Sequence, residues 1–221
     1  MVPLLVLVTF VAFILIDVLL HREKYRFPVA EQPAEPNPAE AVAVAAGVGL
    51  PESLAYHPGH SWAIHQGHGR IRVGLDEFAA SLLGRIERIE TPQRGRWLRQ
   101  GEKGWVVHTP QGTAPMVAPV EGEIVAVNDK LAQDPSLAAR DPYGSGWLLE
   151  VYSPDAEISL RNLLSGSLAR RWMEWAVAEL RQALSPVAIA TALDGGRLHP
   201  ELGADLPQEQ WRELTRRFLL C

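Results

Sequence analysis

The stretch that decides the fold reads PMVAPVEGEIVAVN (residues 115–128) and is followed by DPYG (residues 141–144) and GWL (residues 146–148). Residues 122–128 are rich in strand-forming apolar side chains, and prolines and glycines interrupt the stretch at each end. Short apolar runs bounded by turn residues are typical of strands in an antiparallel sheet. The stretch therefore predicts strands over residues 115–118, 122–128 and 146–152.

The same pattern continues outward over residues 56 to 152. Further strands are predicted over residues 61–65, 70–75, 85–90 and 105–109. One helix interrupts them over residues 76–84, where Asp76 is a capping residue and Gly84 ends the helical pattern. This part of the chain is therefore expected to be a compact β domain with small helices.

After residue 153 the pattern becomes helical. Residues 158–184 carry an apolar side chain every four positions, and Ser165 to Ser167 are expected to divide them into a short and a long helix. The predicted buried stripe consists of Leu160, Leu164, Leu168, Trp172, Ala176, Leu180 and Leu184. A second amphipathic helix is predicted over residues 208–220, with Trp211, Leu214 and Phe218 on one face. We expect this helical extension to pack onto the β domain.

The motifs of the β region fall in a recognisable order. HSW (60–62), VGL (73–75), LLG (82–84), WVV (105–107) and LLS (163–165) accompany the stretches quoted above. This order resembles the glycine cleavage H-protein, a member of the lipoyl- and biotinyl-carrier superfamily, over about residues 56–175. The resemblance implies a flattened β-sandwich, a lipoyl-domain-like barrel-sandwich hybrid, whose hairpin tip presents a prosthetic group. Together with the helices, the expected fold class is α+β, mainly β.

The hairpin tip departs from the family at its functional position. In lipoylated members the tip carries a lysine, usually within Glu-Ser-Val-Lys-Ala, whose ε-amine forms an amide with lipoate. Ungapped spacing from Val107 and from Pro119 puts Gln111 in the place of that lysine. A carboxamide nitrogen is not a nucleophile, so we expect a degenerate carrier without a cofactor. The degenerate tip consists of His108, Thr109, Pro110, Gln111 and Gly112.

No other lysine restores the site. Lys103 precedes the strand that enters the hairpin, and Lys130 lies beyond the opposite layer. Proline at the second position and glycine at the fourth position of residues 109–112 suit a type I turn. A rigid turn suits a docking surface better than a swinging arm.

The N-terminal run Val2–Leu20 is apolar except for Asp17. At about 1.5 Å per residue it reaches roughly 27–29 Å, which is enough for a transmembrane helix. The basic flank follows the run, over residues 21–26, and no cleavage site follows as in a signal peptide. We therefore expect a single-pass anchor with the soluble domain on the cytoplasmic side. Asp17 either snorkels to the interface or contacts another membrane subunit.

Four regions follow from these patterns. They are the anchor with its flank (1–26), a Pro/Ala-rich linker (27–53), the H-protein-like β domain (54–156) and the C-terminal helical extension (157–221). The net charge of -5, with three of the 21 basic side chains being lysine, gives no broad basic face, so nucleic acid is not an expected partner. The single cysteine, Cys221, excludes an intrachain disulfide.

Other candidate sites are weaker. His57, His60, His65 and His68 are grouped in the sequence and are candidate ligands for a transition metal, but strands and turns would scatter their rings. We expect no metal site there. His108 is expected to be an ordinary surface histidine. Trp172 and Trp175 cannot both face one stripe, so one of them is a candidate partner contact.

These observations favour a non-catalytic subunit over an enzyme. The leading hypothesis is a membrane-anchored, H-protein-like domain that docks or scaffolds protein partners, for example as an accessory subunit of a membrane-bound redox complex. The alternative is a genuine acyl or aminomethyl carrier that uses another modified residue. Metal-dependent hydrolysis at the histidine segment is a third hypothesis.

Overall fold

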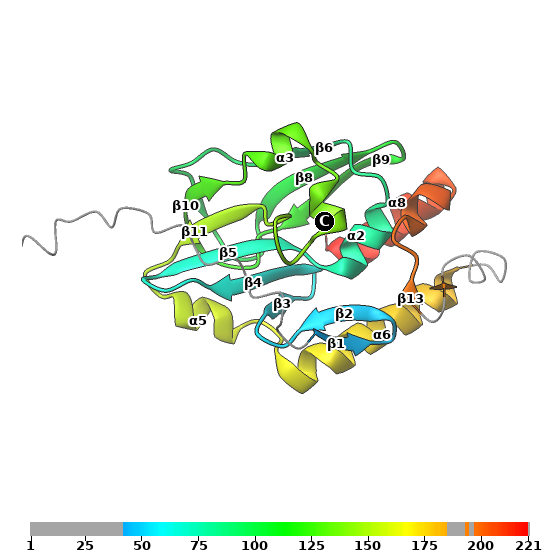
Figure 1. Ribbon diagram of the computed structural model, residues 1–221, viewed down its shortest axis with the longest axis horizontal. Coiled ribbons are helices and arrows are strands. Elements are labelled where there is room, and N and C mark those ends of the chain that lie inside the picture. Colours follow the sequence, from blue (N-terminus) through cyan, green and yellow to red (C-terminus); the bar gives the residue numbers. More distant parts are fainter. Residues whose placement is uncertain (1–41, 185–192, 195–196, 221) are drawn as a thin grey trace, which may run out of the picture. The chain divides into compact units, whose positions relative to one another are not determined.

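The computed structural model describes residues 42–184, 193–194 and 197–220 (Figure 1). The expected anchor Val2–Leu20 with Asp17 lies outside the described residues, as do residues 21–41 and Cys221. Within the described part, no helix combines the length and the apolar character that crossing a bilayer requires.

The larger sheet has six antiparallel strands. Their spatial order is β3 (Ala55–His57), β4 (Ser61–His65), β5 (Arg70–Leu75), β11 (Leu149–Tyr152), β10 (Gly122–Val127) and β7 (Trp97–Leu98). The predicted strands 61–65 and 70–75 are confirmed. β11 begins three residues later than the prediction because the Asn128 side chain donates to the carbonyls of Ser145 (2.8 Å) and Trp147 (2.7 Å), which holds this segment as a loop.

The smaller sheet contains β6 (Arg88–Glu90), β8 (Lys103–Thr109) and β9 (Gly112–Val117) in that order. Pro115 lies within β9, which is an edge strand of this sheet, and edge strands are where proline is tolerated. Val73 and Leu149 of the larger sheet share one hydrophobic core with Val107 and Met116 of the smaller sheet. This mainly β arrangement agrees with the expected lipoyl-domain-like sandwich.

Helix α2 (Glu77–Leu83) follows β5 and is almost entirely buried. Asp76 begins it, because Oδ1 of this residue accepts a hydrogen bond from the Ala79 N–H at 2.7 Å. Gly84 ends it with a φ of 71°, a conformation that glycine adopts without steric cost. The predicted helix is therefore confirmed, and it carries Phe78 and Leu82 into the core. Short helices α3 (Lys130–Gln133) and α4 (Leu137–Arg140) lie between β10 and β11.

The predicted linker is wrong over its last residues. β1 (Val42–Ala45) and β2 (Val48–Pro51) form an antiparallel hairpin in which Ala45, Val48 and Leu50 are buried. The Tyr143 hydroxyl donates to the Gly49 carbonyl at 2.7 Å, and the Gly49 N–H donates to Glu77 at 2.8 Å. The folded domain therefore begins by Val42 rather than at residue 54, because small apolar residues are buried here without a strong strand pattern.

The break in the first helical region is confirmed. Helix α5 (Ala156–Arg161) is separate from α6 (Gly166–Ala183), which begins after Ser165. The predicted stripe is wrong in part: Leu168 is 51% exposed, and the buried residues of α6 are Ala169, Met173, Ala176, Val177 and Leu180. A spacing of four residues exceeds the helical repeat of about 3.6, so a stripe of that spacing rotates away from the core.

The described part of the C-terminal extension ends in β12 (Leu193–Asp194), β13 (Arg197–Leu198), the 3-10 helix η1 (Leu202–Asp205) and α8 (Gln208–Leu219). Trp211, Leu214 and Phe218 of α8 are buried, as predicted. In Figure 1, α8 lies beside α2 and the β8–β9 hairpin, and these contacts join it to the β domain. We refer to residues 197–219 as the C-terminal segment.

Candidate functional site

The predicted turn forms the tip of the β8–β9 hairpin. Thr109 and Gly112 are the last paired residues of the two strands, and the Thr109 hydroxyl donates to the Gly112 carbonyl at 3.2 Å. Neither Pro110 nor Gln111 has a positive φ, which agrees with a type I turn and excludes the two mirror-image turn types. Pro110 and Gln111 thus form the two-residue turn at the end of the β8–β9 hairpin.

The C-terminal segment covers one side of this tip. Gln111 Nε2 donates to the Ala204 carbonyl at 2.7 Å, and Gln208 Nε2 donates to the Gln111 carbonyl at 3.0 Å. The Trp211 ring lies against Gly112, where an added Cβ would be 3.1 Å from a ring carbon. The hairpin tip is therefore held by residues that lie more than 90 positions later in the chain.

Close backbone contact between α2 and η1 places this cover. A Cβ on Gly203 would lie 1.9 Å from the Leu82 carbonyl oxygen, and a Cβ on Gly84 would lie 2.6 Å from the Ala204 nitrogen. The buried Trp211 side chain adds a hydrogen bond from Nε1 to the same Leu82 carbonyl at 3.1 Å. This contact was not predicted from the sequence. The features that could have indicated it are Gly84, Gly203 and the amphipathic face of residues 208–220.

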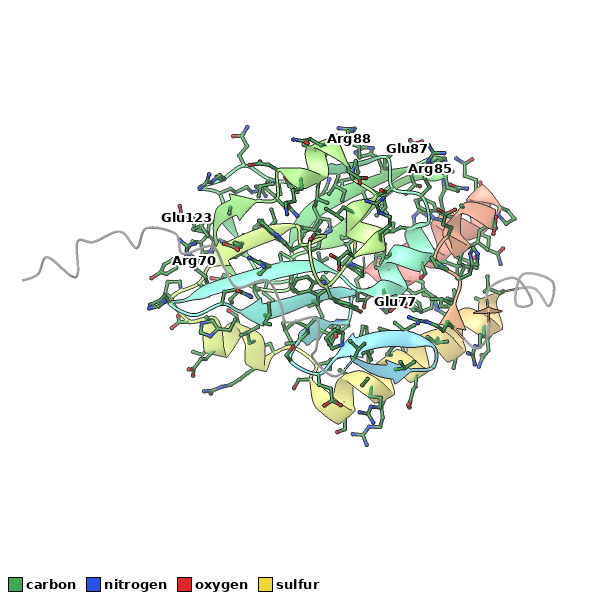
Figure 2. The ribbon with its side chains drawn as sticks, in the orientation of Figure 1. Arg70, Glu77, Arg85, Glu87, Arg88 and Glu123 are labelled. Atoms are coloured by element: carbon green, nitrogen blue, oxygen red, sulfur yellow. The ribbon has the colours of Figure 1, made fainter. Side chains whose placement is uncertain are left out.

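On the outer face of the hairpin, His108 belongs to a surface charge network. Its Nε2 lies 3.2 Å from Glu90 Oε1 and 3.1 Å from Arg88 Nη2, and Arg88 also forms an ion pair with Glu90. The hydrogen bond from Arg88 holds the pKa of Glu90 below its usual value. Figure 2 labels Arg88 at the top edge of the view. His108 therefore lies in an exposed ion-pair network.

A groove of about 440 Å³ lies beside the tip, between β9 and α8. Residues 112–115 line one wall, and Trp211, Arg212, Thr215 and Arg216 line the other. No lysine, cysteine or carboxylate is among these lining residues, so the groove supplies neither an amine nor a thiolate for covalent attachment.

The structure does not gather the four candidate histidines. His57 and His60 lie before β4, whereas His65 and His68 lie at and beyond its other end. His60 Nδ1 is 2.8 Å from Asp76 Oδ2, and its ring stacks on Phe78 at 4.0 Å. The described residues contain no group of three or more His, Cys, Asp or Glu side chains arranged to hold a metal ion.

The surroundings of His57 affect its titration. Burial lowers its pKa, with a smaller contribution from nearby His60. Its Nδ1 accepts a hydrogen bond from the Gly59 N–H at 3.0 Å, which requires that nitrogen to be unprotonated. The arrangement therefore favours neutral His57.

The two candidate tryptophans face different surroundings. Trp172 is half-buried, with its ring centroid 4.6 Å from that of His60 and 6.4 Å from that of Tyr56. Trp175 is 56% exposed on the outer side of α6, where Leu168 is also exposed. Trp172 therefore helps to build the core, and Trp175 is the one of the pair that a partner can reach.

Comparison with known proteins identifies the β domain. The glycine cleavage H-protein family matches residues 54–174. The glycine cleavage system H protein of Mycobacterium avium is 38% identical over 107 residues, which cover 48% of this chain and 81% of the relative. The corresponding protein of Escherichia coli O127:H6 is 33% identical over 125 residues, which cover 57% and 96%.

A solved structure is also similar to part of the chain. The glycine cleavage system H protein from Mycobacterium marinum is 30% identical, covers 53% of this chain and 94% of its own, and superposes with a TM-score of 0.48. The β1–β2 hairpin and the C-terminal segment both lie outside the family match. Because the match spans more than half of the 221 residues, the chain belongs to the glycine cleavage H-protein family.

Proposed function

We propose that this chain is a non-lipoylated H-protein-like subunit that docks partner proteins at the cytoplasmic face of a membrane. The observation that carries the proposal is Gln111 at the tip of the β8–β9 hairpin, where the family resemblance leads us to expect the lipoyl lysine. Its carboxamide is engaged in a structural hydrogen bond and offers no nucleophile. The chain then keeps a protein-binding domain but not the acyl-carrying chemistry.

Membership in a carrier family agrees with the expectation that the chain is not an enzyme. Two sequence features support the membrane location: the apolar run Val2–Leu20 and the basic flank over residues 21–26. A membrane-bound redox complex is the host that we propose. Exposed aromatic residues are frequent contact residues in protein interfaces, so Trp175 is the proposed partner contact on α6.

Gentle detergent extraction from native membranes tests this function. We expect a stable protein partner to co-purify with the full chain, and Trp175→Ala to lower its recovery several-fold. Trp97→Ala is the matched control, because Trp97 is similarly exposed, at 47%, but lies on β7. A chain that purifies alone as a monomer, or equal losses in both variants, would contradict the proposed docking role.

The second candidate function is a genuine acyl or aminomethyl carrier, which family membership favours. It requires a modified residue other than Gln111. Peptide mass mapping of the native protein distinguishes the two functions, because a carrier must show a covalent group on a defined peptide. Metal-dependent hydrolysis gains no support, since the four histidines do not converge.

A further inference from the structure

We infer that the C-terminal segment is a built-in occupant of the hairpin tip, and that it blocks attachment of a carrier group at residue 111 whatever residue is there. This inference rests on the proposed function and deepens it. The chain would have lost carrier chemistry twice, once by losing the amine and once by covering its position. Restoring a lysine alone would then not restore a carrier.

The contacts at the tip involve both backbone and side chain of residue 111. Ala204 accepts the side-chain hydrogen bond, and Gln208 donates to the main-chain carbonyl. Trp211 covers the next residue, Gly112, at van der Waals distance. Only the Ala204 contact depends directly on the glutamine side chain, so most of the cover would remain over a lysine.

Contacts elsewhere in the fold, far from the tip, also hold the C-terminal segment in place. The Gln210 side chain donates to the Ala183 carbonyl at 3.0 Å, and Arg217 forms an ion pair with Glu179, which connects α8 to α6. Arg197 pairs with Glu77 at 3.3 Å, which connects the start of the segment to α2. Glu77 is labelled near the centre of Figure 2. With the buried face of α8, these contacts make the cover part of the folded domain.

Attachment of lipoate needs access that this cover denies. ATP adenylates the lipoate carboxyl and releases pyrophosphate; the lysine amine then attacks the carboxyl carbon, AMP leaves and the nitrogen gives up a proton. The ligase must therefore place a large activated acid within bonding distance of the amine. With Ala204, Gln208 and Trp211 against the tip, a ligase cannot enclose it from the side of α8.

Gly203 offers a way to displace the cover without removing a buried side chain. Alanine there would bring Cβ to 1.9 Å from the Leu82 carbonyl, so η1 must move away from α2 and carry Ala204 with it. Gly67→Ala is the matched control. A Cβ added at Gly67 meets nothing within 4 Å, so no contact is displaced. Because the φ of Gly67 is +85°, alanine there strains the backbone, and the variant therefore controls for a general loss of stability.

The test compares three full-length proteins, Gln111→Lys, Gln111→Lys/Gly203→Ala and Gln111→Lys/Gly67→Ala, each incubated with lipoate, ATP and a lipoate–protein ligase. Intact mass spectrometry follows the modified fraction over time. We expect the double variant with Gly203→Ala to be modified at least about tenfold faster than the other two. Modification of Gln111→Lys alone at the rate of a lipoylated H protein would overturn the inference, as would a folded Gly203→Ala double variant that stays unmodified.

A second measurement tests access to the tip while the C-terminal segment stays in place. In a Cys221→Ser background, maleimide should label Gln111→Cys at least about tenfold more slowly than Thr113→Cys, because Thr113 is exposed on the same hairpin. Equal labelling rates would also overturn the inference. The unsubstituted chain is run in parallel: its modification by the ligase would contradict the proposed function, whereas modification of Gln111→Lys alone contradicts only the covering role.

Discussion

Gln111 donates to Ala204 across 93 positions of sequence, at a distance of 2.7 Å. A hydrogen bond of this kind contributes about 0.5–1.5 kcal/mol to the free energy of unfolding. We predict that Gln111→Ala lowers the unfolding free energy by about that amount in urea denaturation. Gln133→Ala, at an exposed position of α3, is the control and should change it by less than about 0.5 kcal/mol. Equal losses of unfolding free energy in Gln111→Ala and Gln133→Ala would contradict a stabilising role of the Gln111 side chain.

His57 predicts a pH dependence of stability. Its pKa is lowered by burial in the folded state, so just below about pH 6.5 the unfolded chain binds more protons than the folded chain. The unfolding free energy should therefore fall as the pH is lowered from 7 through this window. Glu90 and Asp134, whose pKa values are also lowered, act in a separate window near and below about pH 4.

His57→Asn is the variant that isolates this effect. Asparagine keeps an acceptor for the Gly59 N–H but does not titrate. Urea denaturation at several pH values between 5 and 7.5 should show a shallower slope for the variant than for the parent chain. An unchanged slope would assign the pH dependence to other groups.

Sequence spacing predicts which residue lies at the hairpin tip, but it does not predict which other residues contact the tip. The distances in sequence from Val107 and Pro119 place Gln111 at the turn, because a two-residue hairpin leaves no freedom of register. Ala204 and Gln208 are distant in sequence, and neither carries a local pattern that points to the tip. The histidines show the reverse case, since a close grouping in sequence is spread over both ends of β4.

At the scale of elements, α8 is the one whose packing matters most for the candidate site. Trp211 is 1% exposed and contacts both the tip and α2, whereas Trp175 on α6 is 56% exposed. We predict that Trp211→Ala lowers the unfolding free energy by about 3–5 kcal/mol and Trp175→Ala by less than about 0.5 kcal/mol. Urea denaturation followed by circular dichroism measures both. Similar losses would contradict the assigned packing of α8.

Element boundaries were predictable where the local pattern is strong. β4 and β5 have clear strand patterns between turns, and α2 has a capping aspartate and a terminal glycine. β1 and β2 were missed because Val, Ala and Gly in an Ala-rich stretch resemble a linker, although Tyr143 and Glu77 bind this hairpin. The buried stripe of α6 was predicted incorrectly because it assumed one apolar residue every four positions. The helical repeat is about 3.6 residues, so such a series drifts off the buried face over several turns.

At the scale of the whole molecule, the two additions to the H-protein domain meet on α2. The β1–β2 hairpin contacts Glu77 through Gly49, and the C-terminal segment contacts the same side chain through Arg197. Leu198 also donates from its backbone to Gly47 at 3.2 Å. Both additions therefore belong to one folded unit with the matched region, 54–174.

The proposed anchor predicts how the protein fractionates. The full chain should remain in the membrane pellet after washing with high salt and with alkaline carbonate, because a spanning helix is not released by charge screening. A chain that begins at residue 42 should appear in the soluble fraction. Release of the full chain by salt alone would contradict an anchor over Val2–Leu20.

The most direct test of the central claim is the intact mass of the protein purified from its native cells. We predict the mass of the unmodified chain, because Gln111 provides no amine and the C-terminal segment covers its position. A mass increased by a lipoyl group, or by another acyl-carrying group, would contradict it and would establish the chain as a working carrier.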